Sequence, residues 1–106
     1  MTPEEKALSI FRRPPRCLNC AQTICAAMER EDLIDHMADK ARGKAPGGTC
    51  GALFAAMTLA PDRAEHIRTT FTTTLGANTC AALKTLSTPC PRCVQTAIRL
   101  LSRGEV

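Results

Sequence analysis

A glycine-rich turn near the middle of the chain delivers one cysteine to the beginning of a predicted helix. The turn reads Gly47-Gly48-Thr49-Cys50-Gly51-Ala52, and its first two glycines supply the backbone freedom that a tight turn needs. Thr49 suits the capping position of the helix that follows. Cys50 then lies in the first helical turn, where unpaired N–H groups and the positive end of the helix dipole stabilise a thiolate.

The hydrophobic pattern predicts helices throughout the chain and no strand. Apolar residues recur at helical spacing, most regularly at Ile67, Phe71 and Leu75. We therefore expect an all-α fold, a small bundle of about five to six helices that forms a single domain over residues 1–106. The expected helices cover residues 3–11, a segment that begins near residue 20, residues 50–60 and 61–75, a short segment around residue 80, and residues 91–104. A further apolar set, formed by Leu33, Ile34, Met37 and Ala41, either continues the second helix or follows a break.

The composition argues against a nucleic-acid partner. The chain has 106 residues, of which 44% are apolar, with three Phe and neither Trp nor Tyr. Such a composition suits close-packed helices, whereas surfaces that bind single-stranded nucleic acid are rich in aromatic side chains. The formal net charge of +4 is modest. The basic clusters, which we interpret as solvated faces, are Arg12, Arg13 and Arg16, and Lys40, Arg42 and Lys44.

The N-terminus predicts a cytoplasmic protein. Residues 1–16 include Glu4, Glu5 and Lys6 and lack the apolar stretch of a secretory signal, and no segment is apolar enough to cross a membrane. In a reducing compartment, cysteines favour metal binding or redox chemistry over a framework of structural disulfides. The seven cysteines are also odd in number, so pairing within the chain cannot account for all of them.

Four cysteines at predicted helix starts form the candidate site. They are Cys20, Cys50, Cys80 and Cys93. Four helix N-termini that point at a common centre would lower the pKa values of these thiols, as iron–sulfur clusters and redox-active disulfides both need. The alternative is that each is a small buried hydrophobic residue, which is our interpretation of Cys25. His36 and His66 belong to no metal-ligand spacing and are expected at the surface.

Two C-x-x-C pairs are compatible with several kinds of chemistry. The pairs are Cys17 with Cys20 and Cys90 with Cys93. Their spacing occurs in zinc ribbons, in iron–sulfur ligation and in thiol–disulfide exchange. The two pairs are about seventy residues apart, much further than in compact zinc fingers, so zinc is not the favoured ligand.

Four short motifs, taken in order, resemble the C-GCAxxG-C-C family. They are Asn19-Cys20-Ala21-Gln22, the glycine-rich turn, Phe71 with Gly76 and Cys80, and Arg92-Cys93-Val94. The resemblance covers about residues 16–101. Members of this family are small helical proteins, described as redox-active and named for four cysteines and a CGAxxG motif. Those cysteines correspond here to Cys20, Cys50, Cys80 and Cys93, and the chain departs from the motif at Ala55, which replaces its last glycine.

The resemblance also implies a cofactor and partners. A related domain occurs beside haem-binding regions in split-Soret-type cytochromes, where an iron–sulfur centre has been proposed. This similarity implies a [2Fe–2S]-type cluster on the four cysteines. Members often lie near transporter genes, which implies a membrane transporter as a partner. The small Ala-rich helical surface also suits a homodimer.

Three functions of different classes remain open. The first is electron transfer or redox sensing through an iron–sulfur cluster held by the four cysteines, with a redox partner protein. The second is thiol–disulfide exchange, in which Cys90 and Cys93, or Cys17 and Cys20, are the exchanging pair. The third is a helical interaction module that is stabilised by zinc or holds no metal. No motif indicates a substrate pocket, so the sequence assigns no enzymatic activity.

Overall fold

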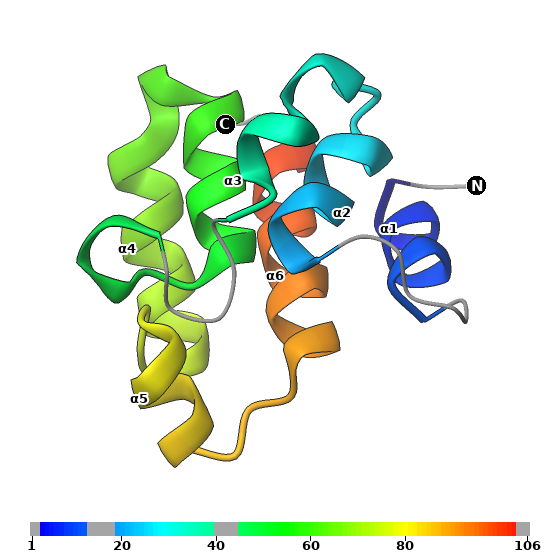
Figure 1. The fold of residues 1–106 in the computed structure, drawn as a ribbon. Coiled ribbons are helices and arrows are strands. Elements are labelled where there is room, and N and C mark those ends of the chain that lie inside the picture. The colour runs from blue at the N-terminus through cyan, green and yellow to red at the C-terminus, as the bar shows by residue number, and fades with distance from the viewer. Residues whose placement is uncertain (1–2, 13–18, 40–44, 104–106) are drawn as a thin grey trace.

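The computed structural model describes residues 3–12, 19–39 and 45–103, and all regular elements in these ranges are helical (Figure 1). The α-helices are α1 (Pro3–Arg12), α2 (Cys20–Ala27), α3 (Gly51–Leu59), α4 (Ala64–Leu75), α5 (Cys80–Thr85) and α6 (Cys90–Arg103). Short 3-10 helices lie between them, namely η1 (Glu31–Leu33), η2 (Asp35–Met37), η3 (Pro46–Gly48) and η4 (Pro61–Arg63). The prediction of a small all-α bundle is confirmed.

Helix α6 contacts four other helices, α1, α2, α3 and α4, and so lies at the centre of the bundle (Figure 1). Helix α3 also packs against α2 and α4. The largest side chains of the core, all without exposed surface, are Ile24, Met37, Leu53, Ile67, Phe71, Val94 and Ile98. Buried alanines supply much of the remaining core, and their small side chains let the helices pack closely. Ala55, at which the chain departs from the CGAxxG motif that it resembles, is one of these alanines.

An asparagine sets the beginning of α2 and attaches the following segment to it. The Asn19 side chain accepts a hydrogen bond from the Gln22 amide (2.7 Å), and the Gln22 side chain accepts one from the Asn19 amide (3.0 Å), which completes a capping box. The Asn19 side-chain amide also donates to the carbonyl oxygens of Met37 and Ala38, both at 3.1 Å. The Gln22 side chain donates to the Ile34 carbonyl oxygen at 3.0 Å. The first turn of α2 therefore holds η2 in place.

Helix α2 ends because Glu29 adopts a left-handed conformation, with φ at 61°. Two amides at this end donate to carbonyl oxygens of the last turn at 2.8 and 3.1 Å, in the pattern of a Schellman motif. The apolar set that begins at Leu33 therefore forms η1 and η2 and does not continue α2. Met37 of this set is fully buried, whereas Ala41 lies outside the described residues.

Helix α4 has the predicted apolar stripe. Ile67 and Phe71 are fully buried, and Leu75 packs against the core with part of its surface exposed. Pro61 begins the helical segment where expected, but its first turn is the tighter 3-10 helix η4. Gly76 ends α4 with φ at 86°, a conformation that a residue without a side chain adopts at little cost.

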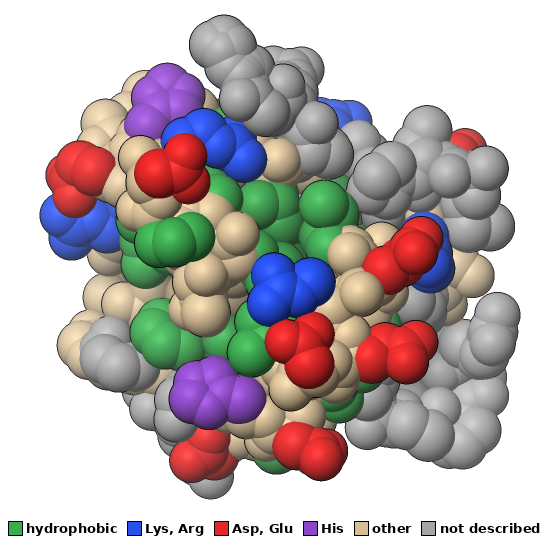
Figure 2. Space-filling model, turned by 90° about the horizontal axis from the view of Figure 1, so that it is seen from above, with side chains coloured by type: hydrophobic (Ala, Val, Ile, Leu, Met, Phe, Trp, Pro, Cys, Tyr) green, Lys and Arg blue, Asp and Glu red, His purple; other side chains and the backbone are tan. Residues whose placement is uncertain are grey.

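Charged side chains are dispersed over the face shown in Figure 2, where Lys, Arg, Asp, Glu and His side chains surround patches of apolar atoms. His36 and His66 are exposed, as the sequence predicts. The two basic clusters predicted as solvated faces lie outside the side chains that the structure describes. In the described ranges, no helix is both long enough and apolar enough to cross a lipid bilayer.

Replacing Asn19 with alanine should lower the free energy of unfolding by about 2 kcal/mol, because the change removes the cap of α2 and two hydrogen bonds to the η2 segment. Asn19→Asp is the matched control. Aspartate keeps the capping oxygen but lacks the side-chain N–H that donates to Met37 and Ala38, so it should lower the free energy of unfolding by about 1 kcal/mol. Urea unfolding followed by circular dichroism measures both values. Wild-type stability of Asn19→Ala would contradict the role given to this side chain.

Candidate functional site

The four candidate cysteines all lie at helix starts, as the sequence predicts. Cys20 is the first residue of α2, Cys80 is the first residue of α5, and Cys93 is the fourth residue of α6. Cys50 is itself the N-cap of α3. The prediction that Thr49 caps this helix is wrong by one residue, because the backbone of Thr49 is engaged elsewhere.

A short antiparallel bridge fixes the beginning of α3. Thr49 pairs with Thr79 in an isolated bridge, and the Cys50 amide donates to the Asn78 carbonyl oxygen at 2.9 Å. Thr79 then caps α5, since its hydroxyl oxygen accepts an amide hydrogen bond from the first turn at 3.2 Å. The bridge therefore sets the starts of α3 and α5 side by side, with Cys50 and Cys80 each directly after a bridged threonine.

The glycines before the bridge have the conformations that the sequence predicts. Gly47 and Gly48 have φ values of 72° and 73°, in a region that residues with side chains rarely adopt. The Gly48 amide closes the turn by donating to the Ala45 carbonyl oxygen at 2.9 Å. The turn therefore brings the chain into the bridge, and Cys50 follows at the end of α3 that carries unpaired N–H groups.

The packing of α3 against α6 brings two of the four cysteines together. The thiol of Cys93 donates a hydrogen bond to the sulfur of Cys50, and the backbone amides of Ala52 and Leu53 also favour the ionised form of this sulfur. The Cys93 contact is the largest cause of a lowered Cys50 pKa, which falls to about 7 although burial acts in the opposite direction. The Cys50 side chain makes no capping hydrogen bond to these amides, which agrees with their smaller effect on its pKa than that of Cys93.

Cys25 shows the effect of burial without such donors. It lies inside α2 with no exposed surface, which confirms the prediction that it is a core residue. Burial raises the pKa of its thiol, and Arg30 opposes this effect only in part. Cys50 is also buried, with 6% of its surface exposed. The opposite direction of its pKa shift therefore comes from the helix start and from the neighbouring thiol.

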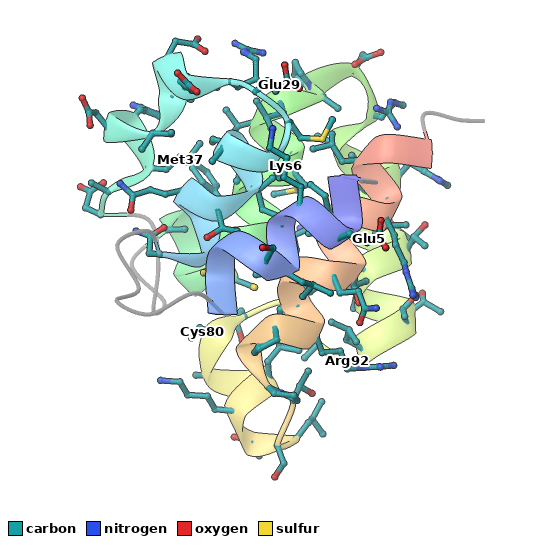
Figure 3. The ribbon with its side chains drawn as sticks, turned by 90° about the vertical axis from the view of Figure 1, so that its right-hand side faces the viewer. Glu5, Lys6, Glu29, Met37, Cys80 and Arg92 are labelled. Atoms are coloured by element: carbon teal, nitrogen blue, oxygen red, sulfur yellow. The ribbon has the colours of Figure 1, made fainter. Side chains whose placement is uncertain are left out.

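The remaining candidate cysteines lie at the surface of the bundle. Cys20 and Cys80 are partly exposed at the starts of α2 and α5, and Figure 3 labels Cys80. Within the residues that the structure describes, no group of three or more His, Cys, Asp or Glu side chains is placed to hold a metal ion. The two C-x-x-C pairs stay predictions, because Cys17 and the side chain of Cys90 lie outside the described part of the chain.

The sequence identifies both members of the thiol pair but not their pairing. Cys50 and Cys93 are far apart along the chain, and neither C-x-x-C motif contains Cys50. The sequence also does not indicate that the Asn78 carbonyl oxygen accepts the hydrogen bond from the Cys50 amide, since any residue type supplies such an oxygen. One sequence feature could have indicated close packing around Cys50. The two residues after it, Gly51 and Ala52, are small, and both are buried.

Comparisons with protein-family models, with curated proteins and with solved structures find no match for this chain. The resemblance to the C-GCAxxG-C-C family therefore stays a prediction from the residue pattern. The function of the chain has to be inferred from the geometry of Cys50 and Cys93.

Replacing Cys93 with alanine should raise the pKa of Cys50 from about 7 towards its ordinary value, because the strongest donor to its thiolate is lost. Cys93→Ser keeps a hydroxyl donor and should retain most of the lowered value. The measurement is the rate of alkylation by iodoacetamide against pH, determined on the tryptic peptide 45–63, which contains Cys50 as its one cysteine. Cys80→Ala is the control and should leave the profile unchanged. Identical pH profiles of Cys50 alkylation in wild type and Cys93→Ala would contradict the hydrogen bond between the two thiols.

Proposed function

We propose that this protein is redox-active through Cys50 and Cys93, which form a disulfide reversibly. The observation that carries the proposal is the hydrogen bond from the Cys93 thiol to the Cys50 sulfur at the start of α3. A thiolate is the reactive form of cysteine, and a second thiol within contact distance resolves the first product of its oxidation. Because its pKa is lowered to about 7, Cys50 has far more thiolate at neutral pH than an ordinary cysteine.

The oxidation consumes an oxidant of the disulfide or hydroperoxide class. The Cys50 thiolate attacks one sulfur of a disulfide, or the terminal oxygen of a hydroperoxide, and displaces the other atom. That atom leaves as a thiolate, or as an alkoxide or hydroxide that takes up a proton. The Cys93 sulfur, after losing its proton, attacks the Cys50 sulfur, forms the Cys50–Cys93 bond and displaces the remaining part of the oxidant. The pair thus gives up two electrons and the proton of Cys93. A reducing compartment such as the cytoplasm returns it to the dithiol form.

An iron–sulfur cluster on Cys20, Cys50, Cys80 and Cys93 is the second candidate, and the bridge between Thr49 and Thr79 is the observation that favours it. This bridge sets the starts of the helices that carry Cys50 and Cys80 side by side. The described residues do not present the complete ligand set, so a cluster would require these side chains to rearrange. When bound, a cluster would supply one-electron transfer. The proposed redox partner protein, membrane transporter and homodimer are compatible with either candidate.

Equilibration in dithiothreitol redox buffers, continued until the products no longer change so that slow access to the buried pair does not matter, is followed by alkylation and trypsin digestion and tests the proposal. Trypsin places Cys50 in peptide 45–63, Cys93 in peptide 93–99 and Cys80 in peptide 69–84. We expect one dominant product that links peptides 45–63 and 93–99 and disappears on reduction. Cys93→Ser should abolish it, and the matched variant Cys80→Ser should not. A mixture of scrambled disulfides would contradict the proposal, and equal iron and sulfide in anaerobically purified protein would favour the cluster.

Oxidation of the pair should also stabilise the fold. A disulfide between residues 50 and 93 closes a loop of roughly forty residues and would raise the free energy of unfolding by up to about 4 kcal/mol. The measurement is thermal unfolding of the oxidised and reduced forms, and Cys93→Ser treated in the same way should show no difference. A disulfide that lowers the unfolding temperature would contradict the placement of these two sulfurs in neighbouring positions of the native fold.

A further inference from the structure

We propose that the oxidant of the Cys50–Cys93 pair is hydrogen peroxide and that disulfides of peptides and proteins are excluded from it. This inference rests on the proposed function and identifies the class of its substrate. It is carried by the burial of both reacting residues, since Cys50 and Cys93 are only 6% and 4% exposed.

Burial discriminates between oxidants by their size. In thiol–disulfide exchange, the attacking thiolate lies in line with the two sulfurs of the disulfide. Both of these sulfurs carry a substituent, so the site needs room for two bulky groups. Hydrogen peroxide carries hydrogen atoms alone and needs little more room than a water molecule. We therefore expect hydrogen peroxide to reach a thiolate enclosed by α3 and α6, and the packed helices to exclude a peptide. The exclusion is steric and does not require a further binding residue.

The surroundings of the pair also suit reaction with a peroxide. The Cys50 thiolate attacks one peroxide oxygen, the O–O bond breaks, and Cys50 becomes a sulfenic acid. The departing hydroxide takes the proton of the Cys93 thiol, which is hydrogen-bonded to the reacting sulfur, and becomes water. The resulting Cys93 thiolate attacks the Cys50 sulfur and displaces a second hydroxide, which becomes water with a proton from the solvent. One peroxide is thus reduced to two waters, and one disulfide forms.

Two other cysteines of the same chain serve as internal references. Cys80 also lies at a helix start but is partly exposed, so it should react with oxidants of either size. Cys25 is fully buried inside α2, and burial raises the pKa of its thiol, so it should react with neither. Cys50 has both a stabilised thiolate and restricted access, so among the three cysteines compared it should show the strong preference for the small oxidant.

The test compares hydrogen peroxide with oxidised glutathione at equal concentrations, using the full chain reduced beforehand. Loss of alkylatable thiol is followed separately in the peptides that contain Cys50 and Cys80. The ratio of the peroxide rate to the glutathione rate should be at least tenfold larger for Cys50 than for Cys80. In urea, where the helices unfold, the two ratios should become equal. In Cys93→Ser, which keeps a donor to Cys50, peroxide should leave a sulfenic acid on Cys50 that dimedone traps once urea has unfolded the helices.

The outcomes separate this inference from the proposed function. Equal rate ratios for Cys50 and Cys80 in the folded protein would overturn the assignment of peroxide, while a Cys50–Cys93 disulfide in redox buffers would still support the proposed function. Failure to form that disulfide with any oxidant would overturn both. Failure to trap the sulfenic acid in peroxide-treated Cys93→Ser after unfolding in urea, in a variant that unfolds cooperatively, would overturn the peroxide step alone.

Discussion

The backbone bridge between Thr49 and Thr79 determines where α3 begins, and the chemistry of the site depends on that position. Because the bridge engages Thr49, the next residue becomes the N-cap, and its sulfur lies beside the unpaired amides of the first turn. Had α3 begun one residue earlier, Cys50 would lie in the first turn and Thr49 would take its capping position. The packing of α3 on α6 then supplies the third donor, the Cys93 thiol.

Two opposing effects act on the Cys50 thiol, and hydrogen bonding is the stronger. Burial favours the neutral form, as it does for Cys25, but the donors from Cys93, Ala52 and Leu53 favour the thiolate. A pKa lowered from its ordinary value of 9.0 to about 7 corresponds to roughly 2–3 kcal/mol in favour of the ionised form. The folded state binds the proton more weakly than the unfolded chain. The stabilisation of the folded state by the Cys50 thiolate is therefore complete above pH 9 and is lost as the pH falls through 7.

Local features of the fold could be predicted from the sequence, and long-range contacts could not. The stripe of α4, the cap at Asn19 and the helix-start positions of four cysteines follow from residue type and spacing. The sequence leaves open whether α2 ends after residue 28 or continues, because Glu29 takes the left-handed position that glycine usually marks. The contact between Cys50 and Cys93 depends on how α3 packs against α6, and no local pattern encodes that arrangement.

A double-mutant cycle on the two thiols tests their interaction most directly. The free energies of unfolding of wild type, Cys50→Ala, Cys93→Ala and the double variant would be measured under reducing conditions at pH 8.5 and at pH 6. The hydrogen bond to a thiolate predicts a coupling energy of about 1–2 kcal/mol at pH 8.5 that largely disappears at pH 6, where Cys50 is protonated. A coupling energy that is zero at both pH values, or equal at both, would contradict a thiolate held by its neighbouring thiol.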